Sequence, residues 1–177
     1  MKSSRLFRSI LLMGSMVILS SVANAQSEVI NKFFAKYNED ERFTSVFVSG
    51  RMFSMFSEVA EEQSQEMKKM MNDLKGLRIL SSEKIDGTRL YKEAFADFNR
   101  SGYEELLKIS GEEELIFLIK EEAGQINELL MLTGNQQKFF LMSIVGKIDL
   151  KTLSKLAGSM NIQGMENLEK LENNNEN

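Results

Sequence analysis

Apolar side chains recur every three to four positions in three stretches of the chain, and this period predicts amphipathic helices. The first stretch spans residues 29–37 and the last spans residues 90–98, where large apolar groups form one stripe. Residues 51–73 show the same period and are expected to form a helix in two pieces, because a polar acidic stretch interrupts them at residues 58–66. Gly76 is expected to end this helical region.

Alternation of side chains, with frequent β-branched residues, predicts strands elsewhere. Residues 43–49 alternate, residues 77–80 form a shorter apolar run, and Asp86-Gly87 indicates a turn. The second half of the chain holds four apolar or alternating runs, which cover residues 106–109, 113–120, 125–133 and 138–147. Because short glycine-containing spacers separate these runs, they predict an antiparallel meander of three or four strands.

A last helix is expected after Asp149, which suits an N-cap. Its apolar positions would be Leu150, Leu153, Leu156, Ala157 and Met160. The polar segment 166–177 has little to bury and is expected to be disordered. Together these elements predict a single α+β domain over residues 26–165, a two-layer fold in which helices pack on a mainly antiparallel sheet. A predicted helix followed by a predicted strand occurs at residues 29–49 and again at residues 90–109. This similarity is compatible with an internal duplication and also with chance.

The first 25 residues have the pattern of a secretory signal peptide. Lys2, Arg5 and Arg8 form a basic start, an apolar run follows at residues 10–19, and residues 23–25 are a small-residue cleavage pattern of the sequence Ala-Asn-Ala. The apolar run is too short to cross a bilayer, which needs about 20 residues. We therefore expect export, cleavage before Gln26, and a periplasmic or secreted protein with no membrane span in its mature form.

Composition excludes several kinds of chemistry. Among its 177 residues the chain has no cysteine, histidine, proline or tryptophan. Disulfides, ordinary zinc sites and Ser-His-Asp or Cys-His nucleophiles are thereby ruled out. With 26 acidic against 22 basic side chains and a formal net charge of −4, the chain is also a poor partner for nucleic acid. No catalytic residue, cofactor or metal ligand is assigned from the sequence.

Two acidic clusters offer a carboxylate chemistry. Glu112-Glu113-Glu114 and Glu121-Glu122 flank predicted strands at hairpin ends. Paired carboxylates can act as acid and base in glycoside hydrolysis when they face each other across about 5–10 Å. The sequence does not place two of these acids in one cleft, so solvated turns are the favoured interpretation and a carboxylate-based hydrolase is an alternative.

Methionines form the other candidate site. Five of them occur at helical spacing: Met52, Met55, Met67, Met70 and Met71. Thioethers on a common helix face can bind Cu(I), and flexible methionine surfaces also suit core packing or the docking of a partner. Packing or docking is the favoured interpretation, and a Cu(I) handling protein is an alternative.

Several segments resemble an exported bacterial family called domain of unknown function 4252. They are residues 43–49, 51–53, 76–80 and 117–121, and above all the run Ile144-Val145-Gly146-Lys147-Ile148-Asp149-Leu150 with the helical segment that follows it to Leu156. The resemblance implies a Gram-negative cell-envelope setting and brings no catalytic residues. Some members resemble lipoproteins, whereas this chain lacks the cysteine, which favours a soluble periplasmic form.

These observations predict a non-catalytic, exported cell-envelope protein that binds a protein partner or an apolar ligand. Its apolar helix faces, and the methionine-containing region from Arg51 to Met71, supply the adaptable surface for this role. Nucleic acid is not an expected partner.

Overall fold

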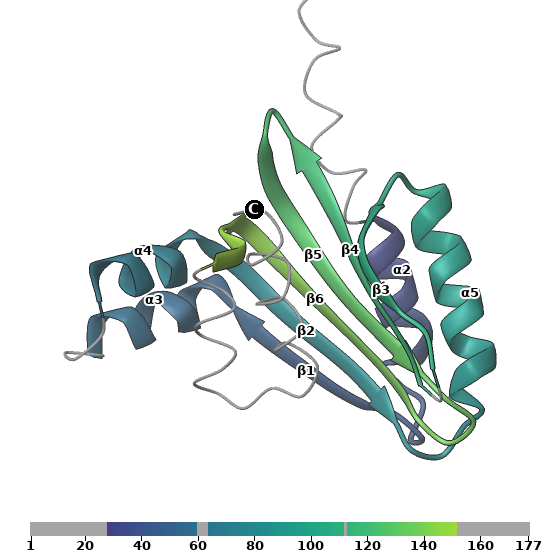
Figure 1. Cartoon of the computed structure of the whole chain (residues 1–177). Coiled ribbons are helices and arrows are strands. Elements are labelled where there is room, and N and C mark those ends of the chain that lie inside the picture. Colours follow the sequence, from purple (N-terminus) through teal and green to yellow (C-terminus); the bar gives the residue numbers. More distant parts are fainter. Residues whose placement is uncertain (1–27, 60–63, 112, 152–177) are drawn as a thin grey trace, which may run out of the picture.

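The computed structural model describes residues 28–59, 64–111 and 113–151. Its helices are α2 (Glu28–Tyr37), α3 (Gly50–Val59), α4 (Gln65–Asp73) and α5 (Gly87–Arg100). Its strands are β1 (Thr44–Ser49), β2 (Leu74–Ser82), β3 (Glu104–Ile109), β4 (Glu114–Glu122), β5 (Gln125–Gly134) and β6 (Phe139–Ile148). All neighbouring strands are antiparallel, in the order β1-β2-β6-β5-β4-β3 (Figure 1). The predicted α+β fold and the meander of four strands are confirmed.

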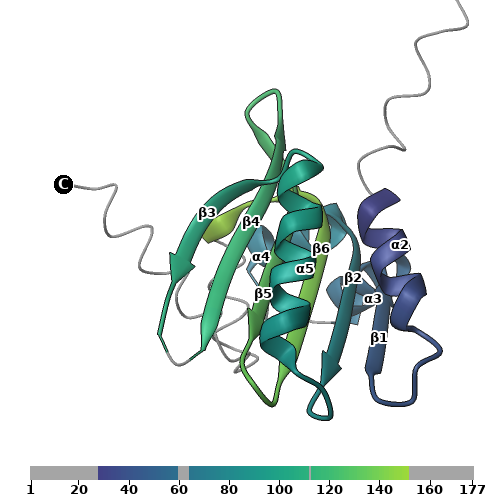
Figure 2. The same cartoon turned by 90° about the vertical axis from the view of Figure 1, so that its right-hand side faces the viewer.

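Helices α2 and α5 cover one face of the sheet (Figure 2). The buried stripe of α5 has the spacing that the sequence predicts, with Leu90, Tyr91, Ala94 and Phe98 all turned to the sheet. Phe98 also meets α2, since its ring centroid lies 5.5 Å from that of Phe33. This face holds the larger of two apolar clusters, and it joins both helices to the middle strands.

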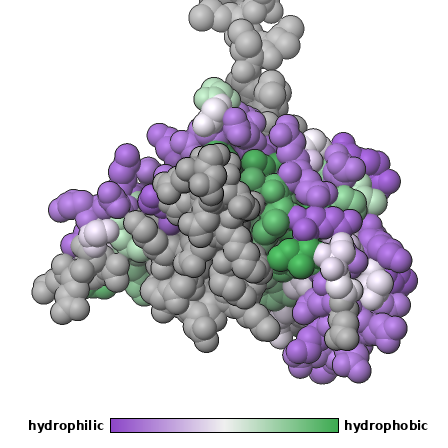
Figure 3. All heavy atoms as spheres, viewed as in Figure 1, coloured by the Kyte–Doolittle hydropathy of each residue, from purple (hydrophilic) through white to green (hydrophobic). Residues whose placement is uncertain are grey.

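The opposite face of the sheet is apolar as well, and helices α3 and α4 pack against one end of it (Figure 1). Met70 and Met71 of α4 enter a cluster with residues such as Phe117, Met131 and Met142. Figure 3 shows apolar side chains gathered over this face of the sheet beside a mostly hydrophilic periphery. The sheet therefore carries helices on both of its faces, which is one layer more than the sequence predicts.

Two local predictions differ from the structure. Gly76 does not end a helix, because α4 stops at Asp73 and Gly76 lies inside β2, opposite Ser49 of β1. The strand expected at residues 77–80 accordingly runs from Leu74 to Ser82. Asp86-Gly87 is not a separate turn but the start of α5, where the Asp86 carboxylate accepts a hydrogen bond of 3.1 Å from the Arg89 amide as an N-cap.

The chain turns tightly between β4 and β5, where Ala123 and Gly124 both have positive φ angles, of 51° and 77°. Such angles suit a two-residue hairpin turn. After β6 the chain passes Asp149, and Leu150 and Lys151 are helical. The remainder of the expected last helix lies outside the described residues, as do the expected signal peptide and the polar tail. Among the described helices, none combines the length and the apolar character that crossing a bilayer requires.

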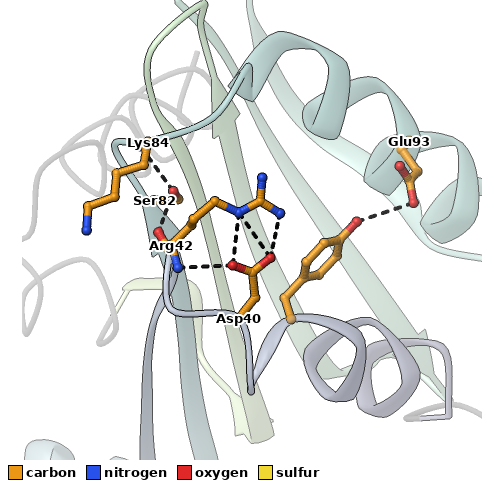
Figure 4. A network of polar contacts seen from close by, with 6 residues as sticks. Asp40, Arg42, Ser82, Lys84 and Glu93 are labelled. Carbon is orange, nitrogen blue, oxygen red and sulfur yellow. Dashed lines mark hydrogen bonds and ion pairs between the residues drawn. The ribbon is translucent and has the colours of Figure 1, made fainter.

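The connection from α2 into β1 is fixed by polar contacts (Figure 4). The Asp40 carboxylate accepts hydrogen bonds from the backbone and side chain of Arg42, with distances of 2.6–3.2 Å. These bonds lower the pKa of Asp40 to about 2. The Arg42 carbonyl in turn accepts a hydrogen bond of 2.7 Å from the Ser82 hydroxyl at the end of β2. These contacts hold the start of β1 beside the end of β2.

Candidate functional site

A pocket of about 220 Å³ lies between the N-terminal part of α2 and one end of the sheet. Strand register creates it, because Arg78 of β2 lies opposite Ser143 of β6, and Glu128 of β5 lies opposite Val145 of β6. These side chains belong to the same sheet face as the larger apolar cluster, but near the end of that face. The lining residues are Ile30, Asn31, Phe47, Lys75, Gly76, Arg78, Glu128, Ser143 and Val145.

The space for this pocket follows from the residues along each strand. On this face β5 presents Leu132 and Leu130 beneath the helices and then Glu128, and β2 presents Leu80 and then Arg78. Gly76 comes next on β2 and has no side chain, so the Phe47 ring of β1 lies over it; a Cβ atom there would be 3.7 Å from the ring. The strand ends therefore leave a hollow with polar groups on its floor and apolar groups on its walls.

Arg78 is a cation of the pocket whose position is fixed by its neighbours. Its guanidinium lies between two aromatic rings, 5.8 Å from the centroid of Phe34 and 5.5 Å from that of Phe47. One of its N–H groups donates to the side-chain oxygen of Asn31. Within the described part of the chain Arg78 forms no ion pair, and neither does Lys75, which lies in the bulge of β2 beside Gly76. Two cations thus remain available at one pocket.

Glu128 provides a buried carboxyl group on the pocket floor, with 4% of the residue exposed. Its two oxygens accept hydrogen bonds from the Tyr103 hydroxyl at 2.6 Å and from the Ser143 hydroxyl at 3.2 Å. Lys120 lies over the Tyr103 ring at 5.0 Å and donates to the Ser101 carbonyl at 3.0 Å. Burial raises the pKa of Glu128, while the two hydrogen bonds and the charges of Lys120 and Arg78 act in the opposite direction.

The raised pKa of Glu128 predicts how stability depends on pH. Above pH 4.5, the ordinary pKa of glutamate, Glu128 keeps its proton in the folded chain and loses it in the unfolded chain. The group therefore stabilises the fold at low pH, and this stabilisation is lost as pH rises through the folded-state pKa. We expect the difference in unfolding free energy, wild type minus Glu128→Gln, to decrease as pH rises above 4.5. Urea unfolding of both proteins at several pH values measures this difference in free energy. A difference that increases with pH would contradict a raised pKa of Glu128.

The acids singled out in the sequence lie elsewhere. Glu113 accepts a hydrogen bond of 3.0 Å from Thr133, Glu114 one of 3.2 Å from Ser110, and Glu122 one of 3.4 Å from Asn127. These acids form hydrogen bonds at loop and hairpin ends, and none of them lines the pocket. Glu112 lies outside the described residues. In the described ranges, no group of three or more acids could hold a metal ion.

The five methionines separate into exposed and buried groups. Met52 and Met55 are 45% and 48% exposed on α3, beside the exposed side chains of Phe56 and Val59. Met67 is half-buried, and Met70 and Met71 are buried in the second apolar cluster. The exposed pair is thus placed on the surface, whereas Met70 and Met71 contribute to the core.

Sequence reasoning did not single out Arg78 and Glu128. A signal existed for Glu128, because it occupies an inward position of the apolar run at residues 125–133, where a charged side chain is unusual. The position of Arg78, Glu128 and Asn31 around one pocket depends on strands and a helix that are distant in sequence, so spacing along the chain does not reveal it.

Comparison with known proteins adds a family. The family model described as Domain of unknown function (DUF4252) matches residues 37–156. The chain belongs to this family. The match covers α3, α4, α5 and all six strands of this DUF4252 domain, and with them every pocket residue except Ile30 and Asn31. No curated protein and no solved structure matches the chain.

Proposed function

We propose that this DUF4252 protein is a non-catalytic binding protein of the cell envelope, and that its pocket binds a small carboxylate with an apolar body. The observation that carries the proposal is the Arg78 guanidinium, held between Phe34 and Phe47 and free of an ion pair among the described residues. A planar guanidinium fork matches a carboxylate with two parallel hydrogen bonds.

The walls and the size of the pocket restrict which carboxylates can bind. Ile30, Phe47 and Val145 offer apolar contact to the remainder of the molecule, while Lys75 adds a second positive charge. The volume of about 220 Å³ is below that of pockets for drug-sized ligands, which span about 300–1,000 Å³. A carboxylate with a single short alkyl chain or one aromatic ring fits this space.

Binding accounts for the pocket better than hydrolysis does. Glycoside hydrolysis requires two carboxyl groups, one as acid and one as base or nucleophile. Among the described residues that line the pocket, Glu128 is the one acid. Both of its oxygens already accept hydrogen bonds, from Tyr103 and Ser143. Glu128 is therefore suited to holding the pocket floor in place through Tyr103 and Ser143.

A pair of isosteric probes tests the proposal. Titration calorimetry should detect binding of 3-phenylpropanoate, and 3-phenylpropanamide should bind at least tenfold more weakly, because a hydrogen bond to a charged group contributes about 1.5–3 kcal/mol. The Arg78→Gln variant should lose the preference for the carboxylate. Lys92→Gln, which removes a cation from the exposed side of α5, is the matched control and should retain it.

Equal affinity for the two probes, or an undiminished preference in Arg78→Gln, would contradict the proposal. Unfolding curves of both variants in urea show whether any loss reflects the pocket rather than the fold.

The envelope location rests on the basic and apolar N-terminal segment before Gln26 and on the resemblance to exported proteins. Mass spectrometry of protein from the periplasmic fraction should give the mass of a chain that starts at Gln26. A mass that includes residues 1–25 would overturn the export proposal and leave the pocket proposal untouched.

A further inference from the structure

The two edge strands of the sheet differ in how they are protected. β3 carries three charged residues, Glu104, Glu105 and Lys108, and a bulge interrupts its pairing with β4. β1 has the uncharged sequence Thr-Ser-Val-Phe-Val-Ser and pairs with β2 over its whole length without a register shift. Charges and bulges are the devices that prevent edge strands from pairing with other chains, and β1 has neither.

Side chains on both faces of β1 are also exposed. Val46 and Phe47 are 41% and 63% exposed, and they point to opposite faces of the sheet. Among the described residues, no strand pairs with the outer edge of β1. Apolar exposure on both faces, next to this row of backbone groups, is the surface that an added strand covers.

We propose that β1 pairs antiparallel with β1 of a second copy of this chain, so that two sheets join into one across a twofold axis. In an antiparallel pair, residues opposite each other point to the same face of the sheet. The twofold axis relates identical residues of the two copies, so it must pass beside a pair of identical residues and not between two successive pairs. A register centred on Val46 places Phe47 of one copy opposite Ser45 of the other, which leaves room for the ring.

Charges that flank β1 favour a second copy as the occupant. Glu41 lies in the turn before β1, and Arg51 lies in the first turn of α3, directly after β1. A register centred on Val46 turns the chain segment before β1 of one copy toward the segment after β1 of the other, and the symmetry repeats this approach. Both side chains are exposed, and neither forms an ion pair within the described part of the chain. The surface is therefore self-complementary: β1 is uncharged, the segment from Glu39 to Arg42 before it has one basic and three acidic side chains, and Arg51 follows it.

Helix α3 extends the interface. Stable interfaces bury about 1,200–2,000 Å² in total, more than a pair of six-residue strands can supply. α3 begins at Gly50, directly after β1, so antiparallel pairing brings the α3 of each copy to the start of β1 in the other. Its exposed Met52, Met55 and Phe56 add apolar area there, with flexible thioethers that can adapt to a facing surface.

Sedimentation equilibrium of the purified full chain tests the proposal. We expect a monomer–dimer equilibrium for the wild type and at least a tenfold weaker dimer for Val46→Lys, because a lysine on the edge opposes strand pairing. Ile109→Lys is the matched control, since Ile109 lies on the other edge strand and is 36% exposed. It should leave the dimer unchanged. A monomeric wild type, or a Val46→Lys variant that dimerises like the wild type, would overturn the proposal.

A charge exchange tests the register separately from the stability of the fold. Glu41→Arg and Arg51→Glu should each weaken the dimer, because each places like charges opposite one another. The double variant restores opposite charges and should recover most of the lost affinity. Additive weakening in the double variant would overturn the register centred on Val46.

Discussion

Replacing Phe98 with alanine should lower the free energy of unfolding by about 3–5 kcal/mol, the range for removing a buried aromatic side chain. Phe98 is 0% exposed and lies where α5, α2 and the start of β3 meet. Its ring centroid is 5.5 Å from that of Phe33 and 6.0 Å from that of Tyr103. Because Tyr103 donates to Glu128, the cavity would also loosen the floor of the pocket.

Urea unfolding followed by circular dichroism measures this loss. The matched control is Phe56→Ala, which removes the same side chain from α3, where the residue is 49% exposed. We expect the control to change stability by less than about 1 kcal/mol, because surface substitutions have small effects. Equal losses in the two variants would show that Phe98 does not occupy the packed position described above.

Replacing Gly87 with alanine should destabilise the chain by about 3 kcal/mol, at the upper end of the usual range for overpacking. A Cβ atom at Gly87 would lie 1.7 Å from the Lys138 carbonyl oxygen and 2.7 Å from that of Asn135. Both atoms belong to the backbone of the connection between β5 and β6, so no side-chain rotation can relieve the contact. The first turn of α5 would have to move away from the sheet.

Gly111→Ala is the control for this prediction. A Cβ atom at Gly111 would meet nothing within 4 Å, and its φ angle is not in the positive region. Thermal unfolding should therefore show a large decrease in midpoint for Gly87→Ala and little change for Gly111→Ala. A similar midpoint for the two variants would contradict the close approach of α5 to the turn before β6.

The sequence predicted the elements whose pattern is governed by burial on one face. The period in residues 90–98 predicts the buried stripe of α5 because each apolar side chain there meets the sheet. The prediction that Gly76 ends a helix is wrong. A glycine after a helical run usually ends the helix, whereas here it provides space beneath the Phe47 ring. That reason lies in a strand almost thirty residues away and leaves no local signal.

The candidate site was less accessible to sequence reasoning than the fold. Arg78 and Glu128 lie on strands that are not neighbours, and β6 lies between them. Their proximity follows from register, which spacing along the chain does not reveal. Methionine spacing was equally ambiguous, since Met52 and Met55 are three residues apart and exposed, whereas Met67 and Met70 have the same spacing and face the core.

The most direct test of the pocket is to map where a small carboxylate binds. Titration of the isotope-labelled protein with 3-phenylpropanoate should shift the backbone NMR signals of Gly76, Arg78, Ser143 and Val145 together, and 3-phenylpropanamide should shift them far less. That result would place the ligand at the Arg78 guanidinium. Shifts confined to other parts of the sheet, or equal shifts with both probes, would contradict a carboxylate-binding pocket in this DUF4252 protein.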